Sequence, residues 1–144
     1  MPASPICIDA SFLIRLLLSP DPGHQQGELW GKWHREGCKI IAPTLIFYEI
    51  ANALHRYFVH NELSQNEVFE LLSIALEFDI ALYGDHELHK RAVEMAQEFN
   101  LPATYDAHYL ALAERFGAEF WTADKKLANS LRGKMPRIHL LQDS

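Results

Sequence analysis

Four acidic residues lie in or beside apolar segments of the chain, where an unpaired carboxylate is costly to bury. Asp9 follows the apolar run ICI, and Glu49 interrupts the apolar pattern LIFYEIANAL. Asp106 lies in ATYDAHY and Asp124 in FWTADKK. If the fold brings the four together, they form a pocket for a hard divalent cation, and such a pocket can cleave phosphodiester bonds.

Three of these acids have a structural alternative. Asp9 and Asp124 each precede a helical pattern, so either carboxylate suits the N-cap position, where it accepts a backbone N–H. Asp106 suits the first turn of its helix, where the helix dipole favours a negative charge. Each acid taken singly is therefore weak evidence for a site.

Glu49 fits no capping role, because it shares a helix face with Ile46 and Ile50 and lies several residues from either helix end. Burying its charge costs several kcal/mol unless the carboxylate is paired or coordinated. The alternatives to a metal are an exposed helix face or an ion pair with Arg15 or Arg56.

The ligand types indicate which metal such a site would hold. An all-oxygen set suits Mg²⁺ or Mn²⁺, whereas zinc prefers His or Cys. His86 with His89, and His34 with Cys38, have zinc-like spacings, but no matching second pair accompanies them. We interpret these four as surface residues.

Short apolar runs alternate with helical patterns along the chain. Strands separated by ten or more helical residues predict a parallel sheet covered by helices on both faces, and ligands bind such sheets beyond the carboxyl ends of the strands, where Asp9 and Asp124 fall. Strands are expected at residues 5–9, 38–42, 79–83, 118–122 and 137–141, and helices at 11–18, 24–35, 44–59, 64–77, 87–99, 105–116 and 125–131.

Composition predicts one compact domain spanning residues 1–144, because nearly half of the residues are hydrophobic. The apolar run FLIRLLL is too short to span a bilayer, so we expect a cytoplasmic protein that does not contact membranes, with both cysteines reduced. The net charge of −6 argues against broad electrostatic attachment to nucleic acid. Bound dications would weaken that objection.

The segments ICIDASFLI, PTLIFYEIANAL and LPATYDAHYLALAERFGAEFWTADKKL, in this order, resemble the PIN-domain nucleases, in particular the small VapC-type toxins of prokaryotic toxin–antitoxin pairs. The match covers nearly the full chain, and YDAHYLALA followed by WTAD is its most specific part. The resemblance implies an α/β fold, a three-layer α/β/α sandwich with a central parallel sheet of about five strands. It also implies an acidic pocket that binds Mg²⁺ or Mn²⁺ for endonucleolytic cleavage of RNA.

The resemblance also implies roles for individual residues. The family's four acidic positions, which bind metal and act in catalysis, correspond to Asp9, Glu49, Asp106 and Asp124. Neighbouring hydroxyl and amide positions support the ligands, and they correspond to Ser11, Thr122 and Asn52. Basic side chains beside these segments are candidates for contact with flanking phosphates, and they are Arg15, Lys125 and Lys126.

The resemblance implies an RNA substrate, a homodimer and a small antitoxin whose peptide blocks the acidic groove. A PIN-domain nuclease of RNA processing without an antitoxin, and a non-catalytic RNA- or protein-binding module, stay open as alternatives. A phosphoacceptor signalling domain is disfavoured, because CIDAS holds one acid instead of an adjacent pair and DIALYG ends without an acceptor Asp. Trp30 and Trp33 are expected to pack against the sheet, although they could stack on bases.

Overall fold

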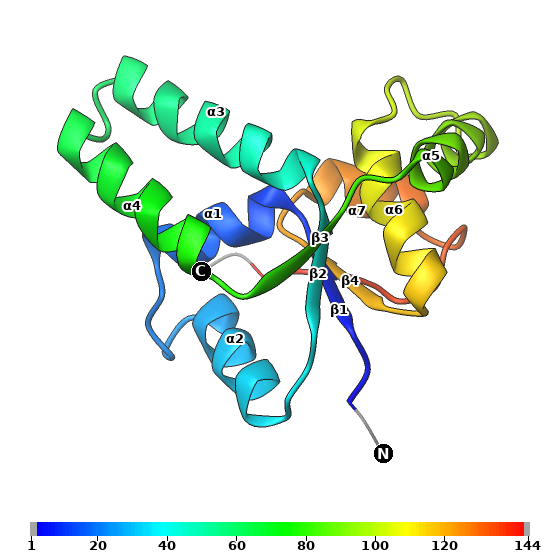
Figure 1. The fold of residues 1–144 in the computed structure, drawn as a ribbon, viewed down its shortest axis with the longest axis horizontal. Helices are drawn as coiled ribbons and strands as arrows, with labels where there is room; N and C mark the ends of the chain where they lie inside the picture. The colour runs from blue at the N-terminus through cyan, green and yellow to red at the C-terminus, as the bar shows by residue number, and fades with distance from the viewer. Residues whose placement is uncertain (1–2, 143–144) are drawn as a thin grey trace.

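A computed structural model describes residues 3–142 of the chain. Within that range five strands form one parallel sheet in the order β3-β2-β1-β4-β5 (Figure 1). The strands are β1 (Ile6–Ile8), β2 (Ile40–Pro43), β3 (Ile80–Tyr83), β4 (Glu119–Thr122) and β5 (Ile138–Leu140).

Helices connect successive strands, and every helix end lies within one residue of its expected position. Chemical signals mark two of these boundaries: Ser64 and Glu67 form a capping box, and Gly117 ends its helix in the left-handed region at a φ of +58°. The helices are α1 (Ala10–Leu18), α2 (Gln25–Arg35), α3 (Leu45–Val59), α4 (Gln65–Glu77), α5 (His86–Glu98), α6 (Tyr105–Phe116) and α7 (Lys125–Leu131).

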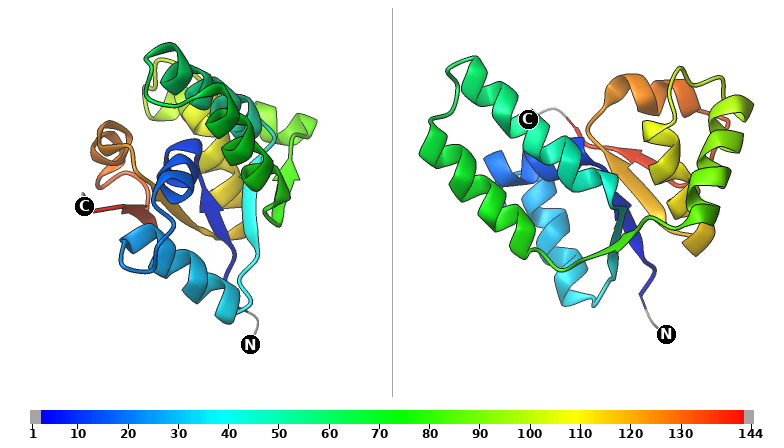
Figure 2. Two further views of the ribbon diagram at one scale, coloured as in Figure 1. Left: turned by 90° about the vertical axis from the view of Figure 1, so that its left-hand side faces the viewer. Right: turned by 45° about the horizontal axis from the view of Figure 1, so that its top comes forward.

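The helices cover both faces of the sheet, which confirms the three-layer α/β/α sandwich. In Figure 2 the helices α1 to α4 lie on one side of the sheet and α5 to α7 on the other. The chain moves outward from β1 through β2 to β3, and then returns to place β4 on the other side of β1. The crossovers after β1 and β4 therefore leave the sheet on opposite faces, which makes the carboxyl ends of these two strands the switch point where ligands bind in such folds.

The central strand β1 is buried along its whole length, as expected for a parallel strand covered on both faces. Beside it, Trp33 is buried, with its ring centroid 5.4 Å from that of Phe12 and 6.0 Å from that of Trp121. Trp30 packs on Phe78 at 5.1 Å. Both tryptophans therefore have the packing role expected of them.

Ion pairs join α5 to α6 on their outer surface. The Arg91 guanidinium donates to both carboxylate oxygens of Glu114 at 2.8 Å and also contacts Glu94 and Glu98. Arg115 of α6 donates to Asp85, the N-cap residue of α5, at 2.8 and 3.0 Å. These pairs fix α6, the helix that carries Asp106, against its neighbour.

Among the helices of the described range, none is both long enough and apolar enough to cross a membrane.

Candidate active site

Asp9 lies at the carboxyl end of β1 and is 6% exposed. Its Oδ1 accepts hydrogen bonds from Ser11 Oγ at 2.7 Å and from the Phe12 backbone N–H at 2.9 Å, so Asp9 is also the N-cap of α1. Its Oδ2 accepts from Thr122 Oγ1 at 2.5 Å. An ionised carboxylate has about four lone-pair positions, and three are used here, which leaves one on Oδ2 for a further ligand.

Two hydroxyls join the crossover after β1 to the crossover after β4. The Ser11 and Thr122 oxygens lie 3.2 Å apart, and each gives its single proton to Asp9. As acceptors, Ser11 Oγ binds the Ala123 N–H at 2.9 Å and Thr122 Oγ1 binds the Asp124 N–H at 3.0 Å. The two strand ends are thus locked together around Asp9.

Asp124 follows β4 and is the N-cap of α7, where its Oδ1 accepts from the Leu127 N–H at 3.1 Å. Asp9 and Asp124 are therefore both helix N-caps and also lie at the switch point of the sheet. One carboxylate oxygen of Asp124 accepts the cap bond, and within residues 3–142 no hydrogen bond is found to the other.

Glu49 projects from α3 and is half-buried. Its Oε1 accepts a 2.5 Å hydrogen bond from the hydroxyl of Tyr109, a buried residue of α6. The expected alternative, an ion pair with Arg15 or Arg56, is not present in the described chain, and Arg15 donates instead to the Gln142 carbonyl oxygen at 3.0 Å. The sequence alone did not identify Tyr109 as a functional residue, although Tyr109 lies one helical turn after Asp106 and must point to the same side of α6.

The electrostatics of the acids centre on Asp106, at the start of α6. Burial raises the pKa of Asp106, and the nearby negative charge of Asp124 raises it further. Burial also raises the pKa of Asp9 to about 6 and raises the pKa of Glu49, and the charge of Asp106 adds to both increases. Asp106 therefore lies close enough to Asp9, Glu49 and Asp124 for their charges to interact at the carboxyl edge of the sheet.

This acidic set fits Mg²⁺ or Mn²⁺ better than zinc. Its donors are all oxygens, and a cation would offset the burial and the mutual repulsion that raise the pKa values. Among residues 3–142, no three acidic, His or Cys side chains approach closely enough to form a ready-made metal cage. Magnesium keeps several of its waters and needs only one or two protein carboxylates, so it matches this open arrangement.

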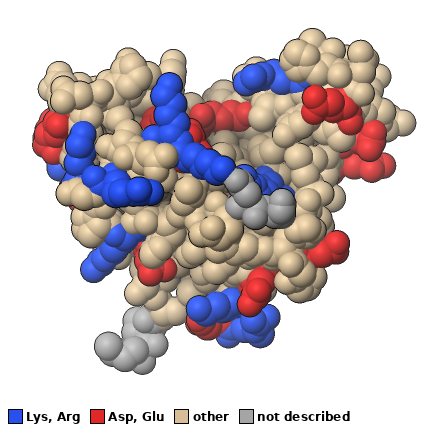
Figure 3. All heavy atoms as spheres, turned by 180° about the vertical axis from the view of Figure 1, so that it is seen from behind, with Lys and Arg blue, Asp and Glu red and all other residues tan. Residues whose placement is uncertain are grey.

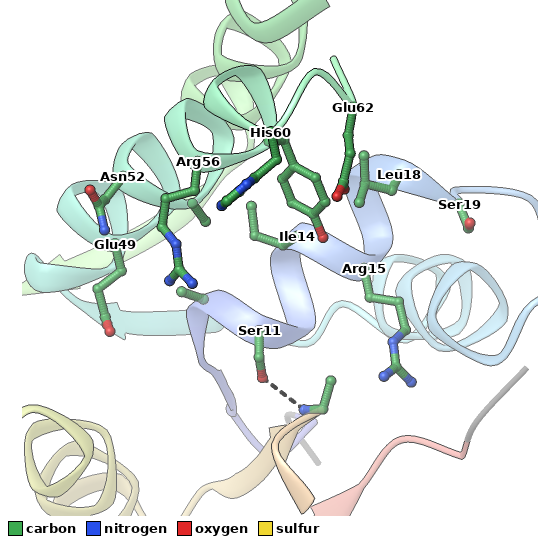
Figure 4. Close-up of a pocket in the computed structure, with 14 residues that line it drawn as sticks. Ser11, Ile14, Arg15, Leu18, Ser19, Glu49, Asn52, Arg56, His60 and Glu62 are labelled. Atoms are coloured by element: carbon green, nitrogen blue, oxygen red, sulfur yellow. Dashed lines mark hydrogen bonds between the residues drawn. The ribbon is translucent and has the colours of Figure 1, made fainter.

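A groove with a volume of about 740 Å³ runs between α1 and α3 (Figure 4). Its lining includes Glu49 and the neighbours of the other acids, Ser11 and Ala123. Figure 3 shows the molecule from behind the view of Figure 1. Basic side chains gather beside the hollow on this face, and acidic side chains lie inside the hollow. Arg15 lines the groove, as does Asn52, which makes no hydrogen bond within the described chain. Lys125 and Lys126 are exposed in the first turn of α7 and do not line the groove.

The chain belongs to the PIN-domain family, because its residues 6–130 match the family model described as PIN domain. One relative is ribonuclease VapC3 of Pyrobaculum aerophilum, which is 30% identical over 125 residues. That alignment covers 85% of this chain and 92% of the relative.

Solved structures share the fold. The crystal structure of PAE2754 from Pyrobaculum aerophilum is 26% identical with a TM-score of 0.66, over 94% of this chain and 83% of that one. Mycobacterium tuberculosis VapC20, described as a sarcin-ricin loop cleaving toxin, has 17% identity and a TM-score of 0.64, over 87% and 94% of the two chains. A toxin–antitoxin complex from Klebsiella pneumoniae has 18% identity and a TM-score of 0.65, over 96% of this chain and 99% of that one. The last two support the fold alone.

Proposed function

We propose that this protein is a Mg²⁺- or Mn²⁺-dependent endoribonuclease and the toxin of a type II toxin–antitoxin pair, built as a single nuclease domain over residues 1–144. The observation that carries the proposal is the convergence of four carboxylates at the switch point of the sheet, where Asp106 lies near enough to Asp9, Glu49 and Asp124 for their charges to interact. The relative named ribonuclease VapC3 supports the reaction class, since the alignment covers most of both chains.

In this mechanism the cation would be held by Asp9 and Asp106 together with Asp124 or Glu49, directly or through waters. Once bound, it would supply Lewis-acid stabilisation of the phosphate charge and a water of lowered pKa. Ser11 and Thr122 orient Asp9 and favour its ionised form, because their hydroxyls donate to it.

The carboxylates that do not contact the cation orient the attacking water and accept its proton. Glu49 has a fixed orientation for such a task, because Tyr109 holds one of its oxygens and leaves the other open to the groove side. The leaving oxygen of the RNA departs on the side opposite the attack, as in-line displacement at phosphorus requires.

The proposed partners are an RNA substrate, a small antitoxin and a second copy of this chain. The antitoxin is supported by the similarity in fold to a chain of a toxin–antitoxin complex. A short upstream reading frame that encodes a DNA-binding protein would distinguish the toxin from a PIN-domain nuclease of RNA processing.

The decisive experiment incubates purified, partner-free protein with total RNA in Mg²⁺ or Mn²⁺ and sequences the new RNA ends. Discrete cleavage is expected in the wild-type protein and in Asp79→Asn, a control that removes an exposed acid elsewhere. Cleavage should disappear in EDTA and in Asp106→Asn. Cleavage that persists in EDTA and in Asp106→Asn would refute the metal-dependent site.

A further inference from the structure

Two histidines of neighbouring helices meet at the surface of the molecule. His89 lies on α5 and His108 on α6, and the two helices lie side by side (Figure 1). The His89 Nδ1 and His108 Nε2 atoms are 2.9 Å apart, and the two ring planes make an angle of 69°. In the sequence only His86 has a suitable spacing to His89, whereas the fold supplies a partner nineteen residues further along the chain.

A backbone carbonyl fixes the orientation of the His108 ring. His108 Nδ1 lies 2.6 Å from the carbonyl oxygen of Thr104, the residue before α6. A carbonyl oxygen can only accept a hydrogen bond, so Nδ1 carries the ring proton and Nε2 directs its lone pair toward His89. Histidines that bind metals are oriented in the same way, because their other ring nitrogen donates to a carbonyl or a carboxylate. His108 is therefore preorganised as a metal ligand through Nε2.

His89 can supply a second ligand to the same ion. His89 is exposed and His108 is half-buried, so a hydrated ion can reach the nitrogens that face each other. When the proton of the His89 ring lies on Nε2, both facing nitrogens present lone pairs. Two nitrogen ligands of a tetrahedral zinc ion, each about 2.1 Å from the metal, lie about 3.3 Å apart, so the rings need to separate by only about 0.4 Å.

The ligand type separates this pair from the acidic pocket. Imidazole nitrogens suit Zn²⁺, Ni²⁺ and Cu²⁺, whereas Mg²⁺ prefers oxygen ligands. Within residues 3–142 no third acidic, His or Cys side chain completes a metal cage around the pair. Waters would fill the remaining positions of a tetrahedral ion. The geometry therefore favours an exchangeable zinc ion over a permanently bound one.

We propose that His89 and His108 form a bridging site for one Zn²⁺ ion, with water as the remaining ligands. A bound ion would tie α5 to the beginning of α6, two residues after Asp106. Because its ligands come from two helices, the ion would bind the folded chain and stabilise it. The site does not depend on the proposed ribonuclease function, since it uses none of the four acids.

The test measures zinc binding in an excess of Mg²⁺, which competes for oxygen ligands but not for imidazoles. Zn²⁺ is titrated into the wild-type protein and into His89→Gln, His108→Gln and His86→Gln by isothermal titration calorimetry. His86 is exposed one turn before His89 on α5, so His86→Gln removes a comparable side chain outside the pair. The difference between the variants separates zinc at the pair from zinc held by acids.

We expect one Zn²⁺ per chain to depend on the pair, with a Kd on the order of 10 μM, because two protein ligands bind more weakly than the four of a structural site. His89→Gln and His108→Gln should each raise this Kd by about tenfold or more, and His86→Gln should leave it unchanged. At ten times the Kd, Zn²⁺ should raise the Tm by about 4 °C in the wild-type protein and in His86→Gln alone. His89 is exposed, so His89→Gln tests binding without a loss of folding.

Unchanged zinc affinity in His89→Gln and His108→Gln would overturn the site. An equal loss in all three histidine variants would also overturn it, since no defined pair would then hold the ion. Zinc-dependent dimers in light scattering that disappear in the two pair variants would show that the ligands come from different chains, against a bridge within one chain. RNA cleavage in Mg²⁺ is measured on the same proteins, and cleavage without zinc binding would refute this site and leave the proposed function standing.

Discussion

The Tyr109 hydroxyl and Oε1 of Glu49 lie 2.5 Å apart, in a hydrogen bond that joins α6 on one face of the sheet to α3 on the other. Tyr109 is 1% exposed, and burial together with the charge of Glu49 raises the pKa of its hydroxyl well above the ordinary range. The hydroxyl therefore stays protonated and remains a donor. Through Tyr109, the position of Glu49 is tied to the helix that carries Asp106.

We predict that Tyr109→Phe lowers kcat/KM for RNA about tenfold near neutral pH, because Glu49 loses the group that orients it. The acid limb of the pH profile should move to higher pH, since this hydrogen bond lowers the pKa of Glu49. Tyr105→Phe, an exposed change on the same helix, is the control and should match the wild-type protein. An acid limb identical in both variants would contradict the orienting role of Tyr109.

Asp9 should make the stability of the metal-free protein depend on pH. Burial raises its pKa from 3.8 to about 6, so the folded state binds a proton more tightly than the unfolded state. The resulting stability is present below about pH 4 and lost as pH rises through about 6, with a total change of about 3 kcal/mol. Urea unfolding in EDTA measures it across this range.

Asp9→Asn cannot ionise, so its free energy of unfolding should fall less between these pH values than that of the wild-type protein. Glu49 and Asp106 stay in the variant and keep part of the slope, because burial raises their pKa values too. Parallel curves for the two proteins would show that Asp9 keeps an ordinary pKa in the fold.

A divalent cation should compete with protons for these carboxylates. At about pH 7.5 we expect Mg²⁺ at about ten times its Kd to stabilise the folded protein by about 1.4 kcal/mol, and to have a smaller effect at about pH 5. Differential scanning fluorimetry, with KCl at equal ionic strength as the reference, measures the shift in Tm. Asp106→Asn should lose the shift and Asp79→Asn should retain it. A shift of equal size in KCl would show ionic screening instead of binding.

The Arg91 ion pairs should stabilise the fold without taking part in the reaction. Arg91→Gln is expected to cost about 1 kcal/mol of unfolding free energy at low salt and less at high salt, because its three partners are partly exposed. Lys90→Gln removes a single exposed contact of 3.6 Å and serves as the control. Activity per folded molecule should be unchanged in both variants, and a selective loss in Arg91→Gln would connect α5 to the site.

Helices and strands were predictable because their signals are local. The capping residues Ser64 and Glu67 and the helix stop at Gly117 act through neighbouring backbone groups, and apolar periodicity marks each amphipathic helix. The parallel sheet followed from the length of the helical connections, since a parallel pair requires a crossover.

The contacts between layers were not predictable in the same way. Asn52 lies one turn from Glu49 in sequence terms, yet the partner of Glu49 is Tyr109, sixty residues away along the chain. Likewise, the acids Glu94 and Glu98 lie on the same helix as Arg91, but the local sequence does not show that Glu114 of α6 also pairs with Arg91. Such contacts depend on helix packing and side-chain rotamers, which one sequence does not specify locally.

The hydroxyls of Ser11 and Thr122 meet beside Asp9, although the two residues are 111 positions apart in the sequence. During synthesis, Asp9 is made early but cannot receive the Thr122 hydrogen bond until β4 has left the ribosome and docked beside β1. At ordinary translation rates this separates the two events by on the order of ten seconds. The arrangement around Asp9 therefore forms only after most of the chain has been translated.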